Sequence, residues 1–435
     1  MKNTALALTL ILVLLVSAIA GTLFVRIASA QPAEIISIKD DGCIEPSTAP
    51  SIAWSRTYTD SGLLEVDSLL QTEDGGFLMA GKTSSGASQP TYIELVKVNS
   101  LGDVQWNKTY EGIGSQLTKW LVQTSDGNYA IAGEYIFTSQ QKVGFWLAKL
   151  NPNGDIIWTK TYFGEGFGWA EVLMQTSDGG YALVGPTHAD THIITGEMDI
   201  WLLKTDPSGN QQWAKTVGTG FANSIVQTAE GGYALAAYST SANFQLIETS
   251  SNGTVEWVKT FGNQDKATAS SVVQTSDGGF AVGGAMWLRS NGGGLNLAVV
   301  KTDPSGNEQW TKYYGSGIVR DLLQTSDGGF AIASNPFFKV DAAGNKQWEL
   351  SLGNLTNVYS VIQTQNGGYA VAGATNANGA SEGWMAVIGS TDSTNPTPTS
   401  TPEVEPFPAS LLFVASVGIA LGAVGLLVYF RKRKH

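Results

Sequence analysis

The stretch Gln175-Thr-Ser-Asp-Gly-Gly-Tyr-Ala-Leu-Val-Gly185 is one of seven related copies in a chain of 435 residues. Its Ser-Asp-Gly-Gly segment is typical of a hairpin turn, because glycine accepts the positive φ that such turns need. The apolar residues on either side predict two short strands. A spacing of roughly fifty residues between copies indicates a repeat fold. The copies begin at Gln71, Gln123, Gln175, Gln227, Gln274, Gln324 and Gln363.

Each copy is followed by the pattern of two more strands. In the third copy, residues 199–204 and 211–217 predict these strands, and Asp206-Pro-Ser-Gly-Asn210 predicts the turn between them. Four short strands without a helical period predict one blade of a β-propeller. The second turn carries a Gly-x-x-x-Trp spacing, as in Gly209 and Trp213, which recurs in six places. We expect the indole to pack over a glycine turn and lock adjacent strands.

The last copy lacks its fourth strand, and a matching strand precedes the first copy. Trp54-Ser-Arg-Thr-Tyr58 resembles Trp106-Asn-Lys-Thr-Tyr110, which forms the predicted fourth strand of the first copy. A strand left over at the start and one missing at the end are typical of a closed ring. We therefore predict an all-β fold, a seven-bladed β-propeller over residues 51–389 closed by its N-terminal strand.

The two ends of the chain predict export and anchoring. Residues 1–30 have the charge, apolar run and small residues of a signal peptide or signal anchor, and residues 31–50 form a leader. Residues 390–408 are rich in Ser, Thr and Pro, which predicts a stalk. Residues 409–430 carry no charge and predict a transmembrane helix, followed by a basic cytoplasmic tail at 431–435. We expect a single-pass protein whose propeller lies outside, at the cell surface.

Composition argues against two other classes of protein. The net charge is −12, and the basic cluster Arg431-Lys-Arg-Lys434 lies in the predicted tail. The rest of the chain therefore lacks the basic face that a nucleic-acid-binding protein uses to meet phosphates. Cys43 is the one cysteine, so no disulfide forms within the chain. Packing has to stabilise the fold.

Two resemblances extend these predictions. The QTSDGGYA-type repeat resembles that of uncharacterised secreted and surface β-propeller proteins of archaea and bacteria, which implies display on the cell surface with a binding or structural role. The segment Pro402-Glu-Val-Glu-Pro-Phe-Pro408, with the apolar and basic residues after it, resembles archaeosortase-type sorting signals, although it departs from their usual Pro-Gly-Phe or Pro-Glu-Phe form.

The Gly-x-x-x-Trp turn is similar to the tryptophan-docking motif of quinoprotein dehydrogenase propellers. Those proteins typically have eight blades and hold a quinone over a calcium ion, and many have a vicinal cysteine pair. Seven predicted blades and one cysteine favour a structural role for the motif here. The repeated turn aspartates are also compatible with calcium, but aspartate commonly caps its own turn, which is the preferred interpretation.

The loops between second and third strands and between blades vary most, which is typical of a recognition surface. Phe167, Trp169 and Trp287 are candidate platforms there for an extracellular glycan or protein, with a packing role equally open for Trp169. His188, Asp190 and His192 form an H-x-D-x-H pattern that suits a metal, although a solvated loop is favoured. Three N-x-T sequons give glycosylation candidates at Asn107, Asn252 and Asn354.

The preferred hypothesis for function is a surface-anchored binding or adhesion module that uses this variable loop face. An extracellular enzyme, either quinoprotein-like or a hydrolase with carboxylates at the ring's centre, is the alternative. A structural component of the cell envelope is a third hypothesis. No cysteine lies within the predicted propeller to act as a nucleophile, and we assign no catalytic residue.

Overall fold

The computed structural model describes most of residues 49–389. The described ranges are 49–59, 62–84, 91–110, 121–137, 142–164, 166–188, 198–239, 244–262, 267–288, 293–353, 356–376 and 379–389. All belong to one compact unit, Pro46–His435. The predicted signal segment, leader, stalk, transmembrane helix and tail lie almost wholly outside these ranges. Within them, no helix has the length and apolar character needed to span a bilayer.

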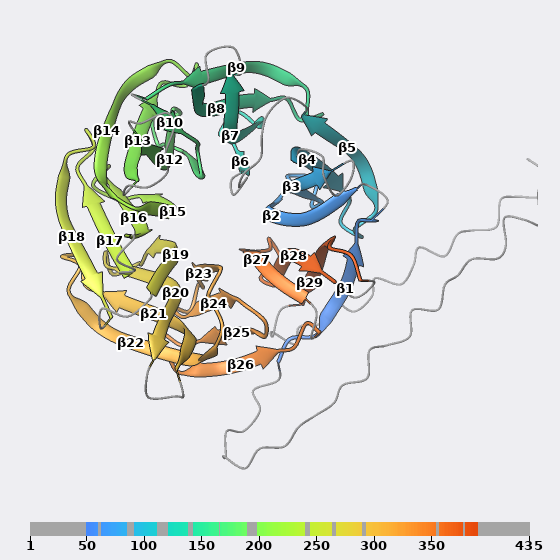
Figure 1. Cartoon of the computed structure of the whole chain (residues 1–435). Coiled ribbons are helices and arrows are strands. Elements are labelled where there is room, and N and C mark those ends of the chain that lie inside the picture. Colours follow the sequence, from blue (N-terminus) through green and yellow to red (C-terminus); the bar gives the residue numbers. More distant parts are fainter. Residues whose placement is uncertain are drawn as a thin grey trace, which may run out of the picture. The chain divides into compact units, whose positions relative to one another are not determined.

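The described strands form seven antiparallel sheets, which are the blades of a propeller (Figure 1). Blades 1 to 3 consist of β2 (Leu63–Gln71), β3 (Phe77–Ser84), β4 (Thr91–Val98) and β5 (Val104–Tyr110); β6 (Leu121–Gln123), β7 (Tyr129–Phe137), β8 (Lys142–Leu150) and β9 (Ile156–Tyr162); and β10 (Phe167–Gly168), β11 (Val172–Gln175), β12 (Tyr181–His188), β13 (Asp199–Thr205) and β14 (Gln211–Thr219).

The remaining four blades repeat this order of strands. Blades 4 and 5 consist of β15 (Phe221–Gln227), β16 (Tyr233–Tyr238), β17 (Phe244–Thr249) and β18 (Val255–Phe261); and β19 (Ala267–Gln274), β20 (Phe280–Leu288), β21 (Gly294–Thr302) and β22 (Glu308–Ser316). Blades 6 and 7 consist of β23 (Asp321–Gln324), β24 (Phe330–Ala333), β25 (Phe337–Val340) and β26 (Lys346–Leu350); and β27 (Thr356–Gln363), β28 (Tyr369–Thr375), β29 (Glu382–Ile388) and β1 (Ile52–Thr57).

The ring is closed by the N-terminal strand, as the sequence predicts. Strand β1 pairs antiparallel with β29, so that Arg56 lies opposite Met385. The inner strands also contact one another around the ring, and β2 of the first blade contacts β27 of the last. The prediction of a closed seven-bladed β-propeller is therefore confirmed.

The hydrophobic core lies between blades rather than within one sheet. One cluster joins Phe244 and Leu246 of blade 4 to Phe280 and Val282 of blade 5, and each of these side chains is buried. Blades 1 and 2 meet in a similar cluster. Strands two and three of a blade therefore read as nearly continuous apolar runs, because both faces of each sheet are covered.

The Gly-x-x-x-Trp motif also acts between blades. Gly209 has φ of +76°, and a Cβ on it would stand 2.8 Å from the ring of Trp158, which belongs to the preceding blade. Gly253 stands in the same relation to Trp213. Our expectation that the motif locks adjacent strands is thus corrected: glycine and tryptophan of one motif serve two different interfaces, and the indole locks adjacent blades.

The residues that recur in the QTSDGG copies have structural roles in the turn. Oε1 of Gln227 accepts a hydrogen bond of 2.8 Å from the backbone N–H of Ser177 in the preceding blade. The carboxylate of Asp178 accepts hydrogen bonds from the backbone N–H of Gly180 at 3.0 Å and from Nζ of Lys204 at 2.8 Å. The glutamine bond joins five pairs of neighbouring blades in the described part of the chain. The aspartate likewise holds a lysine of the third strand in five blades.

Candidate functional site

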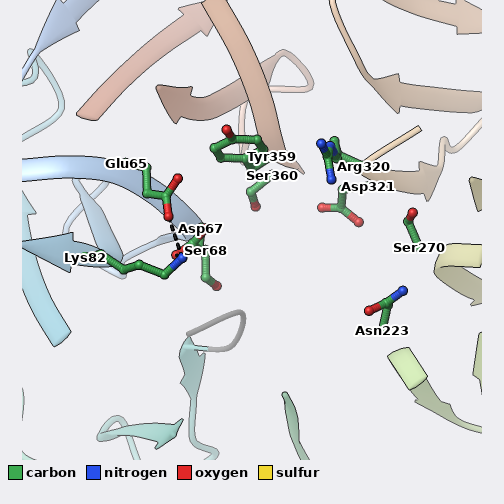
Figure 2. A pocket seen from close by; sticks show the side chains of 10 residues that line it. All are labelled: Glu65, Asp67, Ser68, Lys82, Asn223, Ser270, Arg320, Asp321, Tyr359 and Ser360. Atoms are coloured by element: carbon green, nitrogen blue, oxygen red, sulfur yellow. Dashed lines mark hydrogen bonds and ion pairs between the residues drawn. The ribbon is translucent and has the colours of Figure 1, made fainter. Parts of the chain in front are cut away.

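A cavity of about 190 Å³ lies among the inner strands of the ring (Figure 2). This volume is below the ~300–1,000 Å³ of pockets that hold drug-sized ligands, so it suits a small one. Blades 1, 4, 5, 6 and 7 contribute to its lining. The lining side chains are all polar: Glu65, Asp67, Ser68, Lys82, Asn223, Ser270, Arg320, Asp321, Tyr359 and Ser360.

A β-bulge in four inner strands places one extra polar side chain at the cavity. In blade 1 the register with β3 shifts between Val66 and Ser68, which leaves Asp67 as the extra residue. Such a bulge bends the strand and re-aims its side chain. The same shift occurs in β15, β19 and β27, where the extra residues are Asn223, Ser270 and Tyr359.

An acidic wall of the cavity is held together by a lysine. Nζ of Lys82 on β3 lies 2.5 Å from Oε1 of Glu65 and 3.9 Å from Oδ2 of Asp67, both on β2. Burial disfavours the charged lysine, but the two carboxylates outweigh this effect and raise the pKa of Lys82. Lys82 therefore stays protonated at neutral pH, and the three groups together carry one formal negative charge.

Arg320 and Tyr359 form a second wall, and Figure 2 shows Tyr359 between Arg320 and Glu65. The guanidinium of Arg320 lies 5.6 Å from the centre of the Tyr359 ring, a cation–π contact. Burial and the charge of Glu65 raise the pKa of Tyr359, so the phenol is neutral at physiological pH. Arg320 is exposed, and its side chain makes no ion pair or hydrogen bond with the other described residues.

Asp321 lines the cavity but holds blades together. Its Oδ1 accepts a hydrogen bond of 2.9 Å from Oγ of Ser271 in blade 5, and its Oδ2 accepts one of 3.1 Å from the backbone N–H of Val361 in blade 7. Serines take this role elsewhere: Oγ of Ser224 accepts from the backbone N–H of Val272. These bonds account for the carboxylate of Asp321 without a ligand.

The predicted aromatic platforms lie outside the cavity lining. Phe167 and Trp169 are neighbours, with ring centres 5.9 Å apart in an edge-to-face arrangement. Trp169 is half-buried, and its Nε1 donates a hydrogen bond of 3.3 Å to Glu171. Trp287 is the second-last residue of β20 in blade 5, with 38% of its surface exposed, and no described contact joins it to the other two. Their role in binding stays a prediction.

The metal candidates are described only in part. His188 is half-buried at the end of β12, opposite Phe167, whereas Asp190 and His192 lie outside the described residues. Among the residues that the structure describes, no group of three or more His, Cys, Asp or Glu side chains is arranged to hold a metal ion. The turn aspartates are instead engaged by turn N–H groups and lysines, as for Asp178.

Two of the three sequons fall on described surface. Asn107 is exposed on the outer strand β5, where its Nδ2 donates a hydrogen bond of 3.3 Å to Glu94. Asn252 is exposed in the turn before β18, and its Oδ1 accepts a hydrogen bond from Oγ1 of Thr254. Asn354 lies outside the described residues.

The cavity itself was not found from the sequence, although a signal for it exists. The residue four positions before each repeat glutamine differs in every copy, while the hairpin after the glutamine hardly changes. Five residues at this position line the cavity, and the equivalent in the third copy, Glu171, is buried. In chain order the position holds Asp67, Lys119, Glu171, Asn223, Ser270, Arg320 and Tyr359, of which Lys119 lies outside the described residues.

Comparison with known proteins gives the fold alone. No protein-family model matches the sequence, and no curated protein matches it. The Dos1 propeller is similar in structure, with a TM-score of 0.50 at 9% identity over 75% of this chain and 79% of that chain. Two further structures are similar at lower scores. They are a protein of unknown function from Bacteroides caccae (TM-score 0.42, 13% identity, 63% and 93% of the two chains) and a streptogramin B lyase (0.49, 10%, 77% and 97%).

Proposed function

We propose that the protein is a cell-surface binding module that takes a small polar ligand into its central cavity. The observation that carries this proposal is the ring of unlike polar side chains that one position of the inner strands presents to the cavity, beside hairpin turns that hardly change from copy to copy. Copies that serve only architecture have no reason to diverge at one inward-facing position. Divergence at that position is what a ligand without sevenfold symmetry requires.

The physical cost of the lining supports the same proposal. Placing half-buried charged and polar groups around a cavity is unfavourable compared with filling the space by apolar side chains. Sites for small molecules accept this cost because convergent polar groups orient the ligand. Here Asp67, Asn223, Ser270 and Tyr359 converge from four separate blades, and bulges in their strands aim them there.

Display outside the cell rests on the ends of the chain. The signal segment at 1–30, the stalk at 390–408 and the apolar stretch at 409–430 support an exported protein held by a single span. We propose that the propeller stands on this stalk, exposed to extracellular ligands. Adhesion to a glycan or protein through Phe167, Trp169 and Trp287 on the loop face is part of the same proposal.

A binding screen with a blocked cavity tests the proposal. The full chain, purified in detergent, is screened by thermal shift against sugars, amino acids, organic acids and nucleosides. Ser270→Phe fills the cavity, and Ser177→Phe on an exposed turn is the matched control. We expect a ligand that stabilises wild type and Ser177→Phe but not Ser270→Phe, with both variants folded. A cavity site would be contradicted if every ligand found binds all three proteins alike, or if the screen finds no ligand.

A further inference from the structure

Resting on the proposed function, we infer that the cavity binds a small organic acid: its carboxylate lies against Arg320, and hydrogen-bond donors at its other end face Glu65 and Asp67. The inference assigns a chemical class to a ligand that the fold alone leaves open. It follows from which groups of the lining are already engaged and which are available.

Arg320 is the available cation. The ring of its neighbour Tyr359 lies 5.6 Å from the guanidinium carbon and stacks on the guanidinium. The N–H groups at the edge of the guanidinium stay available as donors. Lys82, the other cation of the lining, is engaged by Glu65 at 2.5 Å and lies 3.9 Å from Asp67. A planar guanidinium matches a carboxylate with two parallel hydrogen bonds, so an anionic end of a ligand belongs beside Arg320.

The acidic wall favours a ligand that presents hydrogen-bond donors to it. Glu65, Asp67 and Lys82 together keep one formal negative charge, and carboxylate oxygens accept hydrogen bonds. On a third side of the cavity, Nδ2 of Asn223 donates to the backbone oxygen of Ala269 at 2.7 Å, which leaves Oδ1 of its amide as an acceptor. A ligand that carries an ammonium or hydroxyl groups opposite its carboxylate satisfies both sides.

Other ligand classes fit less well. A simple cation is repelled by Arg320, and the third carboxylate, Asp321, is already engaged by Ser271 and by the backbone of Val361. A neutral sugar leaves the guanidinium unpaired. A polymer exceeds a cavity of about 190 Å³. Sugar acids and amino acids whose ammonium lies at the opposite end from the carboxylate share the required chemistry, and the experiment separates them.

Matched probes test the inference by calorimetry on the full chain in detergent. D-Glucuronate and 4-aminobutanoate are the acids, and D-glucose and 4-aminobutanamide are their partners without a carboxylate. We expect one acid to bind and its partner to bind more than about tenfold more weakly, since a hydrogen-bonded charge contributes about 1.5–3 kcal/mol. Arg320→Gln should weaken the acid by a similar factor, and Arg320→Lys by less. Arg56→Gln removes an arginine from the outer strand β1 and should change nothing.

The outcomes separate the two proposals. A partner without a carboxylate that binds as tightly as its acid, or an acid whose affinity survives Arg320→Gln, overturns the inference and keeps the cavity as a binding site. If no probe binds but the wider screen gives a ligand without a carboxylate that Ser270→Phe excludes, the inference is wrong and the proposed function stands. If the wider screen also gives none, both are wrong.

Discussion

The backbone N–H of Gln365 donates a hydrogen bond of 2.8 Å to Oε1 of Gln71, although 294 residues separate the two in the chain. The same bond joins Ser177 to Gln227 between blades 3 and 4. The last blade therefore meets the first through the same bond that joins four other pairs of neighbouring blades. The repeat glutamine joins neighbouring blades, and Gln71, its copy in the first blade, bonds the first blade to the last.

Removing the side chain of Gln71 tests whether the ring is closed in solution. Gln71→Ala should lower the free energy of unfolding by about 0.5–1.5 kcal/mol, the net value of one such hydrogen bond, and Gln227→Ala should cost a similar amount. Urea unfolding of both variants measures the two costs. A normal loss for Gln227→Ala beside none for Gln71→Ala would mean that the first and last blades are not joined.

Two glycine substitutions separate backbone strain from the tryptophan contact. Gly127 has φ of +78° and open space around a Cβ, whereas Gly209 has φ of +76° and the ring of Trp158 at 2.8 Å. Gly127→Ala should cost about 1 kcal/mol through positive φ alone. Gly209→Ala should cost about 1–3 kcal/mol more, because the added methyl group overpacks the blade interface. Equal melting temperatures for the two variants would contradict the packing of each indole on the next blade.

The sequence was sufficient for blade number and closure because each blade repeats the same turns. The Gln-Thr hairpin recurs in all seven blades, so counting its copies counts the sheets. The Gly-x-x-x-Trp turn recurs six times, which leaves the fourth strand of the last blade to the N-terminal segment. The glycine on which each tryptophan packs could not be predicted from the sequence. Trp158 and Gly209 belong to different copies of the motif, and only the twist of one blade against the next brings them together.

Acid should weaken the turn that holds Lys204. Burial acts to raise the pKa of Asp178, but hydrogen bonds from Lys204 and Thr176 outweigh it and lower that pKa to about 2. A carboxyl group with a lowered pKa in the folded state stabilises the fold above its unfolded pKa. That contribution is lost as the pH falls from about 4 through about 2.

Asp178→Asn makes this contribution measurable. Because the carboxylate is half-exposed, the variant should lose about 1 kcal/mol near neutral pH, and the loss should shrink towards zero at about pH 2. Urea unfolding across this range gives both values, with Glu73→Gln as an exposed control on the equivalent turn of the first blade. A cost for Asp178→Asn that is constant with pH would rule out the ionic contribution.

Blade 4 lacks the aspartate–lysine pair, and restoring the pair should stabilise the protein. Glu248 stands where five other blades have the lysine, and Glu230 stands at the aspartate position. Burial, with the charges of Glu256 and Glu230, raises the pKa of Glu248. Glu248→Lys with Glu230→Asp should therefore stabilise the protein by about 0.5–1 kcal/mol near neutral pH. Glu248→Gln, which removes only the repulsion, should gain less. A loss of stability on introducing the lysine would refute this interpretation.

The cavity could not be predicted from the repeat, because its residues are where the repeat breaks down. Asp67 and Arg320 occupy one structural position, but nothing in their local sequence says that they face one space. Bulges add to the difficulty: an extra residue in an inner strand reverses which side chains point inward, and alternation alone does not reveal it. Comparing the copies at the position four before each glutamine would have shown the variation, though not the cavity.

Crystallography of the protein soaked with a ligand from the screen tests the central claim most directly. The account predicts difference density inside the ring, with an anionic group beside Arg320 and the opposite end near Asp67 and Asn223. Density on the variable loops at Trp287 or Trp169, with the cavity holding only water, would contradict a cavity site and would favour recognition by the loop face.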